Sequence, residues 1–157
     1  MKGPDQTRAR LKKLFPTVGH AWLFARVAAW TALMPAFFRL LSLPRLMRLL
    51  TPEAAVAPVS EDRVARADLV CMYIMGVLNL DADNRRRGAC LKRSLVLYRF
   101  ARLAGLPVVF HVGVRREEGE LRGHSWLELE GQHRWDPQAH VAFATTFSYP
   151  VPEAKAP

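Results

Sequence analysis

The spacing of apolar residues divides this chain into a helical half and a half made of strands. Three segments have the apolar spacing of helices: residues 18–50, 60–78 and 89–105. Three shorter segments alternate apolar and polar positions, as strands do: residues 108–116, 121–130 and 133–136. The sequence therefore predicts an α+β fold in which helices pack on a small antiparallel sheet of three strands, followed by an irregular tail over residues 137–157.

The N-terminal helical segment is predicted to be an extension of the main domain. Pro35 and Pro44 interrupt its apolar pattern, so two or three short helices are expected there. Residues 51–59 are rich in alanine and proline, as linkers often are. We therefore expect an N-terminal helical extension over residues 1–59 and a folded domain over residues 60–157.

Both helices of the folded domain carry sequence signals at their ends. Ser60 is a predicted N-cap, and two acidic residues follow it in the first turn, where the helix dipole favours negative charge. The second helix is predicted to begin at Ala89 or Cys90 and to end at Gly105, with Pro107 just beyond. These signals place Cys90 in the first turn of a helix.

The positive charge of the chain is concentrated near its N-terminus. Of 23 Lys/Arg and 14 Asp/Glu, nine Lys/Arg and only Asp5 fall in residues 1–50, a net charge of +8 out of +9. A nucleic-acid-binding domain would carry its basic residues on the folded unit, so this distribution argues against a nucleic-acid partner. It favours a basic, apolar segment that contacts a partner protein or an anionic membrane surface.

The N-terminal segment lacks the sequence pattern of a membrane span or a secretion signal. Its longest run without a charge is the twelve residues Val27–Phe38, whereas a span needs about 20 apolar residues. Two cysteines are too few for a disulfide framework. We therefore expect a cytoplasmic protein with reduced thiols, in which residues 18–50 pack on the core, bind a partner, or contact the inner face of the membrane peripherally.

Cys90 is the candidate nucleophile. A thiol at a helix N-terminus meets unpaired backbone N–H groups and the positive end of the helix dipole, and both favour the thiolate. The alternative is a small buried apolar residue, as free cysteines often are, and this is the interpretation favoured for Cys71. Arg85, Arg86 and Arg87 form either a solvated loop or a contact for an acidic leader or partner.

The first predicted hairpin brings a histidine opposite a glycine. With a turn at about residues 117–120, His124 is expected to pair with Gly113 and Trp126 with His111. A glycine at position 113 would leave room for the end of a helix to approach the face of the sheet that carries His124.

The second predicted turn brings a carboxylate near the same histidine. A turn near Gly131 would place Asp136 opposite Trp126 and diagonal to His124, within reach of a side-chain hydrogen bond. A carboxylate on one ring nitrogen leaves the other for a thiol, which gives a nucleophile, a base and an orienting group. The alternatives are that Asp136 only starts a turn before Pro137 and that His124 is satisfied by the backbone.

Two segments carry a resemblance to a known family. The stretch CLKRSLVLYRFARLAGLPVVFHVGVRR, which begins at Cys90, and GHSWLELEG, which contains His124, resemble the transglutaminase-like cysteine peptidases of lasso-peptide biosynthesis. Those enzymes cut the leader from the precursor peptide before the macrolactam closes. The resemblance covers about residues 60–136. It implies a transglutaminase-like or papain-like core with Cys90 as nucleophile, His124 as base and Asp136 as orienting carboxylate.

The resemblance also implies partners. Some relatives carry a small winged-helix-like domain that recognises the leader, and residues 1–59 do not fit one. The divided form of the family is therefore expected, in which a separate leader-recognition protein presents the precursor peptide and the ATP-dependent cyclase associates with the peptidase. A non-catalytic adaptor that binds a peptide or the membrane, and another amide-processing enzyme of this fold, are the alternatives.

The remaining candidates concern substrate and metal. Three residues near the expected site are candidates for substrate binding: His111, Trp126 and Arg93. Four histidines do not have the spacing of a zinc site: His111, His124, His133 and His140. No metal or other cofactor is therefore expected for this chemistry.

Overall fold

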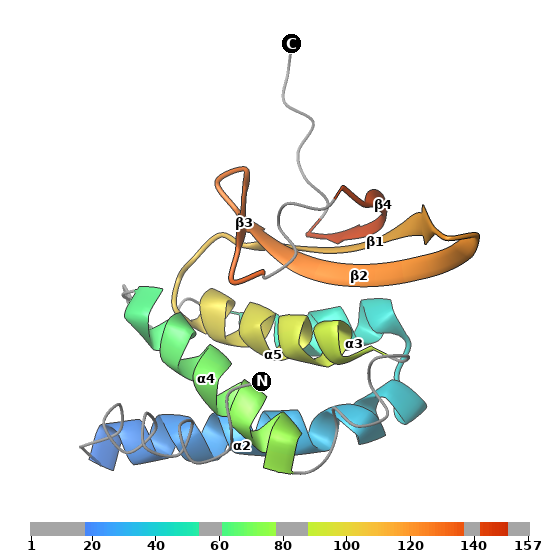
Figure 1. The fold of residues 1–157 in the computed structure, drawn as a ribbon. Coiled ribbons are helices and arrows are strands. Elements are labelled where there is room, and N and C mark those ends of the chain that lie inside the picture. Colours follow the sequence, from blue (N-terminus) through green and yellow to red (C-terminus); the bar gives the residue numbers. More distant parts are fainter. Residues whose placement is uncertain (1–17, 54–60, 78–87, 137–141, 151–157) are drawn as a thin grey trace.

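The computed structural model describes residues 18–53, 61–77, 88–136 and 142–150, and these residues form layers of helices beneath one sheet (Figure 1). The helices are α2 (Val18–Leu40), α3 (Leu43–Leu50), α4 (Glu61–Val77) and α5 (Ala89–Leu103). The strands are β1 (Val109–Glu117), β2 (Glu120–Leu129), β3 (Gln132–Arg134) and β4 (Ala144–Tyr149). Helix α5 packs directly under β1 and β2, and α2 lies on the side of α5 away from the sheet. The predicted α+β class is confirmed.

The N-terminal helices differ from the prediction. The expected break at Pro35 is absent, because α2 continues for 23 residues with this proline inside it. Four buried side chains lie on one face of α2 on the N-terminal side of the proline: Leu23, Val27, Thr31 and Met34. We attribute the unbroken helix to this burial against α4 and α5, which outweighs the loss of one backbone hydrogen bond. Pro44 lies in the first turn of α3, where a proline is tolerated.

Several predicted features lie outside the described residues. They are the Ser60 cap, most of the 51–59 linker, the arginines 85–87 and His140. The predicted boundary between residues 59 and 60 also falls there. On its N-terminal side, α2 and α3 contribute Val27, Leu46 and Leu50 to the same apolar core that α5 fills.

The ends of α5 follow the predicted signals. The helix begins at Ala89, after Gly88 with φ 91°, so Cys90 lies in its first turn. At the other end, Gly105 has φ 71° and its N–H bonds Arg102 O at 3.0 Å. The N–H of Leu106 bonds Ala101 O, also at 3.0 Å. This pair of bonds is a Schellman motif, which a glycine at position 105 permits.

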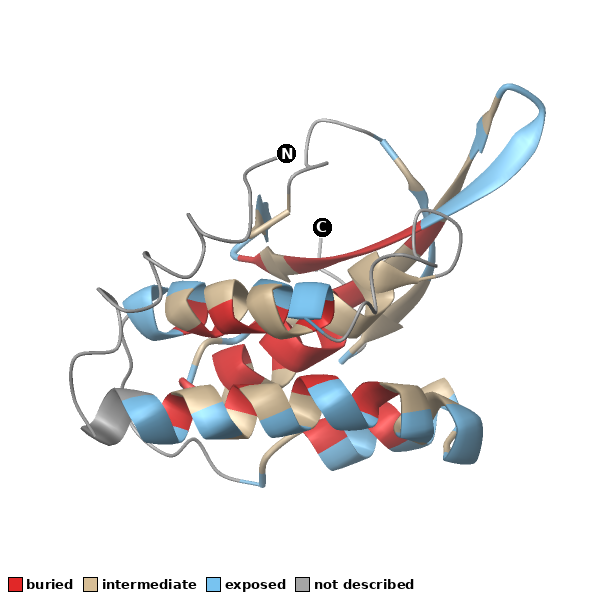
Figure 2. Cartoon of the chain, turned by 60° about the horizontal axis from the view of Figure 1, so that its bottom comes forward, coloured by how far each residue is buried: buried red, intermediate tan, exposed pale blue. Residues whose placement is uncertain are grey.

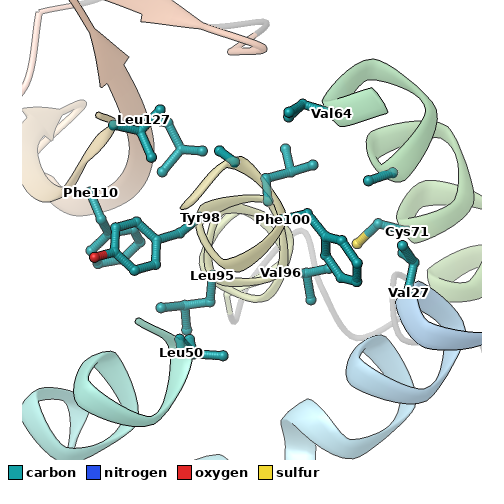
Figure 3. Close-up of a cluster of buried hydrophobic side chains, with 14 of the residues drawn as sticks. Val27, Leu50, Val64, Cys71, Leu95, Val96, Tyr98, Phe100, Phe110 and Leu127 are labelled. Atoms are coloured by element: carbon teal, nitrogen blue, oxygen red, sulfur yellow. The ribbon is translucent and has the colours of Figure 1, made fainter. Parts of the chain in front are cut away.

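Apolar side chains surround α5 (Figure 3). Five elements place buried side chains against it: Val27 of α2, Leu50 of α3, Cys71 of α4, Phe110 of β1 and Leu127 of β2. The Tyr98 hydroxyl, fully buried on α5, lies 3.0 Å from Thr51 Oγ1. A helix packed on so many sides has little freedom to move, so its first turn is fixed relative to the sheet.

The sheet has one strand more than predicted. Its order is β3-β2-β1-β4, and β4 pairs antiparallel with β1 inside the tail that was expected to be irregular. That expectation was wrong for residues 144–149. Phe147 and Tyr149 of β4 pack on the core, while the residues at its start are exposed. Only Phe147, Ser148 and Tyr149 alternate apolar and polar residues, which is too short a pattern to predict a strand.

The first hairpin has the predicted register, and the second does not. His124 pairs with Gly113 and Trp126 with His111, as expected. In the second hairpin the turn is at residues 130–131 and the register differs from the prediction by one residue, since Leu127 pairs with Arg134. Continued pairing would place Asp136 opposite Ser125, not opposite Trp126.

The space above Gly113 is occupied by the side chain of Trp126. A Cβ atom on Gly113 would lie 2.9 Å from Trp126 Cη2 and 2.9 Å from Ala144 O. The room that Gly113 leaves on this face is filled by the indole of Trp126 and not by the end of a helix. The glycine lets β4 and this ring approach β1 together.

This arrangement predicts the effect of one methyl group on stability. Gly113→Ala should lower the free energy of unfolding by about 1–3 kcal/mol, because the indole and a backbone carbonyl must both shift. Gly76→Ala in α4 is the matched control, since nothing lies within 4 Å of its Cβ position. It should leave stability unchanged or raise it by roughly 0.5–1 kcal/mol. Urea unfolding followed by circular dichroism measures both, and equal stability of Gly113→Ala and wild type would contradict the packing.

Candidate active site

Cys90 is a half-buried thiol whose pKa is influenced by two residues of β2. They are His124 and Ser125, which lie 34 and 35 residues further along the chain. Burial by itself raises the pKa of Cys90. The hydrogen bonds from His124 and Ser125 and the positive charge of His124 outweigh it, so the pKa of the thiol is lowered from its ordinary value.

The first turns of α5 lie along the part of the β2 edge that β3 does not pair with. Strand β3 ends at Arg134 and pairs only with residues 127–129 of β2, so the backbone of Ser125 lies beyond it. The carbonyl of Ser125 accepts a hydrogen bond of 2.9 Å from Ser94 Oγ, and its N–H bonds the sulfur of Cys90. A strand residue directs its N–H and C=O to the same edge. Both groups of Ser125 are therefore satisfied by α5.

His124 connects the thiol to a carboxylate. Its Nε2 lies 2.9 Å and 3.1 Å from the two carboxylate oxygens of Asp136, and both side chains are buried. Because Asp136 occupies Nε2, Nδ1 is the nitrogen left for Cys90. Burial by itself lowers the pKa of His124, but the hydrogen bonds and charges of Cys90 and Asp136 raise it above its ordinary value.

Asp136 reaches His124 by a route that strand pairing did not predict. The register of β3 alone would direct Asp136 to the face of the sheet opposite His124. Trp135 has φ 56°, a left-handed conformation that redirects the chain directly after β3. The predicted proximity of Asp136 and His124 is therefore observed, although the predicted reason for it was wrong.

Arg93 supports this redirected turn. On α5, its Nε and Nη2 donate to both carboxylate oxygens of Asp68 on α4, at 2.6 Å and 2.8 Å. Nη2 also donates to Trp135 O at 2.8 Å. The guanidinium therefore joins two helices to the residue before Asp136. These contacts position the carboxylate that binds His124. The predicted contact of Arg93 with substrate stays a prediction.

Aromatic rings enclose the imidazole of His124. Phe143 lies 5.0 Å from it and Trp126 lies 6.1 Å from it, between ring centroids. Trp126 also stacks on His111 at 5.3 Å. The Trp126 side chain, predicted to contact substrate, is 5% exposed and packs against this histidine pair. These contacts restrict rotation of the His124 ring and exclude water from its faces.

His111 lies outside the hydrogen-bond chain of Cys90, His124 and Asp136. Its Nδ1 is 2.9 Å from Ser148 Oγ of β4, and its Nε2 is 3.4 Å from Glu128 Oε2. Burial lowers the pKa of His111 below its ordinary value, against the opposing charge of Glu128. A neutral His111 beside Trp126 is consistent with packing, and substrate binding by His111 stays a prediction.

The described part of the chain holds no cluster of side chains that could bind a metal ion. Among those residues, no three His, Cys, Asp or Glu side chains are grouped so that they could bind a metal ion. The arrangement can instead transfer a proton from a thiol to an imidazole. A lowered thiol pKa beside a raised imidazole pKa favours a thiolate–imidazolium pair, and such a pair is a strong nucleophile next to a proton donor.

Three residues of this site were missed by sequence analysis. Ser125 and Asp68 were not singled out, although Ser125 follows His124 directly, and Phe143 was assigned to the irregular tail. Their roles depend on contacts between distant segments, which neither spacing nor periodicity encodes.

Comparison with known proteins identifies a family for this chain. The family model described as the Transglutaminase-like superfamily matches residues 30–148. Neither the curated proteins nor the solved structures include a match to the chain. The matched range contains Cys90, His124 and Asp136, and it begins inside α2.

The contacts of Arg93 predict a variant that alters the thiol from a distance. Arg93→Gln should loosen the Trp135–Asp136 turn, weaken the Asp136–His124 bond, and so raise the pH at which Cys90 becomes alkylated by iodoacetamide. Stability should also fall, by about 1.5–3 kcal/mol for the lost charged hydrogen bonds. Mass spectrometry of the alkylated protein across a pH series measures the midpoint.

Arg99→Gln is the matched control on the same helix. Arg99 donates to Leu49 O and Leu50 O at 3.2 Å and 3.4 Å and lies 4.1 Å from the Trp30 ring, away from the thiol. It should lower stability without moving the alkylation midpoint. Equal midpoints for Arg93→Gln and Arg99→Gln would show that Arg93 is only a stability residue.

Proposed function

Because the chain belongs to the transglutaminase-like superfamily, we propose that it is a cysteine peptidase that cuts the leader from a lasso-peptide precursor. One arrangement carries the proposal: the half-buried thiol of Cys90, in the first turn of α5, is close enough to His124 for each to shift the pKa of the other, and the buried carboxylate of Asp136 binds Nε2 of that histidine. The resemblance of the segments around Cys90 and His124 to the lasso leader peptidases supports the substrate class. The superfamily membership by itself supports an amide-processing role.

In the proposed first step, the Cys90 thiolate attacks the peptide carbonyl at the junction of leader and core. The new S–C bond gives a tetrahedral oxyanion. The backbone N–H of Cys90, which belongs to the first turn of α5, is a candidate donor to that oxygen. The C–N bond then breaks, and the Nδ1 proton of His124 passes to the leaving amine of the core peptide. The product is a thioester between Cys90 and the leader.

In the proposed second step, water hydrolyses the thioester. His124, now neutral, takes a proton from the water as the oxygen attacks the carbonyl. The S–C bond breaks, the leader leaves as a carboxylic acid that loses its proton to solvent, and Cys90 returns to the thiolate beside a protonated His124. Throughout both steps Asp136 keeps Nε2 protonated and the ring oriented, which is the role of the third member of such a set.

The proposal includes partners. A separate leader-recognition protein would present the precursor, and the cyclase would take the freed amine of the core before it diffuses away. The resemblance to the divided form of the family supports both. Arg93, His111 and Trp126 lie beside the proposed site, and their predicted contacts with substrate belong to this proposal as well.

The test is a cleavage reaction with the full-length chain. The protein is incubated with a lasso precursor peptide and its leader-recognition protein, and product masses are read. Wild type should release leader and core whose masses sum to the precursor plus one water. Cys90→Ala should lose the activity, and His124→Ala should lose roughly 100-fold or more.

Cys71→Ala is the matched control, because Cys71 is fully buried on α4 and forms no part of the proposed site. It should cleave as wild type does. Cleavage that survives Cys90→Ala would contradict the peptidase proposal. A product in which the leader's acyl group is joined to another amine, with no water added, would assign the site to acyl transfer instead.

A further inference from the structure

The outward side of α2 has an unusual composition for a helix surface. Among the described residues of this helix whose exposure is defined, from Ala21 onward, nine side chains are exposed: Ala21, Trp22, Ala25, Ala29, Ala32, Leu33, Ala36, Arg39 and Leu40. Only Arg39, at the C-terminal end, is polar. A surface helix ordinarily presents charged and polar residues to water, so this side of α2 is suited to contact with an apolar surface and not with water.

The large apolar side chains of this surface lie on one line. Leu33 follows Trp22 by 11 residues and Leu40 follows Leu33 by 7, which correspond to about three and about two helical turns. Their exposed fractions are 66% for Trp22, 50% for Leu33 and 77% for Leu40. Ala29 and Ala36 lie between them. We call this line, from Trp22 to Leu40, the apolar stripe.

The other side of α2 is already occupied. Its buried residues pack on α4 and α5, as the alternation of buried and exposed positions along the helix shows (Figure 2). Contrary to the expectation from the charge-free runs, the segment Ala21–Leu40 is long and apolar enough to cross a membrane, because the helix continues through Pro35; only 22% of that window is buried in the molecule. A core helix would be mostly buried, and a spanning helix would have to leave α4 and α5. A helix lying in a membrane surface keeps both its protein contacts and an apolar medium.

The charges around the stripe indicate which surface it meets. Between Asp5 and Glu53 the chain has eight Lys/Arg and no Asp/Glu. Three of these arginines, Arg39, Arg45 and Arg48, are exposed at the end of α2 and on α3. A partner helix packed along the stripe would ordinarily be specified by charges of both signs beside the seam. Basic residues alone complement anionic phospholipid headgroups.

We propose that α2 and α3 dock the protein on an anionic membrane surface, with the apolar stripe in the boundary between headgroups and acyl chains. The exposed Leu49 of α3 and the neighbouring arginines extend the contact. In this pose the sheet lies on the far side of α5 from the lipid (Figure 1), so β2 and its contacts with Cys90 lie away from the membrane surface. Docking does not depend on the proposed peptidase activity, so Cys90→Ala should bind as wild type does.

The test is sedimentation of the full-length chain with two kinds of vesicle. One kind is phosphatidylcholine alone, and the other is an equal mixture of phosphatidylcholine and phosphatidylglycerol. Wild type should sediment with the anionic vesicles and stay in solution with the neutral ones. Leu33→Glu, which places a carboxylate in the middle of the stripe, should weaken partition to anionic vesicles tenfold or more.

Leu121→Glu is the matched control. Leu121 is 72% exposed on the β1–β2 hairpin, in the sheet and away from α2, so the same substitution there should leave vesicle binding unchanged. Circular dichroism shows whether each variant is folded. Unchanged binding by folded Leu33→Glu, or equal binding of wild type to both vesicle types, would overturn the proposal. So would a stripe-dependent dimer in gel filtration without vesicle binding, because the stripe would then be an interface between copies of the chain.

Discussion

The site depends on one constraint, which is that the first turns of α5 satisfy the edge of β2 where β3 has ended. Ser94 binds the carbonyl of Ser125, and the sulfur of Cys90 binds its N–H. Buried backbone groups are rarely left unpaired, so this docking favours one position of the thiol. Packing of α5 against the other helices and the sheet keeps the helix in that place.

Ionisation follows from the same docking. Once the sulfur is beside β2, His124 is its neighbour, and each side chain stabilises the charged form of the other. The turn at Trp135 brings Asp136 to the far nitrogen of the ring, and Arg93 bonds the carbonyl of that turn. Helices α4 and α5, strand β2 and the turn after β3 thus contribute to one proton-transfer site, while α2 leaves an apolar stripe on the opposite side of α5.

Local signals predicted much of this arrangement. The glycine at 105 marked the end of α5, and the first hairpin had the predicted register, because both depend on residues close in sequence. Features set by distant contacts were not predicted. Burial of one face of α2 overcame the break expected at Pro35, and the left-handed Trp135 altered the path to Asp136. Strand β4 exists because β1 offers a free edge, which no pattern in residues 144–149 could reveal alone.

The most direct test of the pairing between Cys90 and His124 is the pKa of the His124 imidazole, measured by nuclear magnetic resonance in wild type and in Cys90→Ala. The signal is assigned by its absence in His124→Gln. In wild type the pKa should lie above that of an ordinary histidine, because Cys90 and Asp136 raise it. In Cys90→Ala it should fall, since the thiolate is gone while burial, which lowers it, persists. An identical His124 pKa in the two proteins would contradict the pairing of sulfur and imidazole on which the site rests.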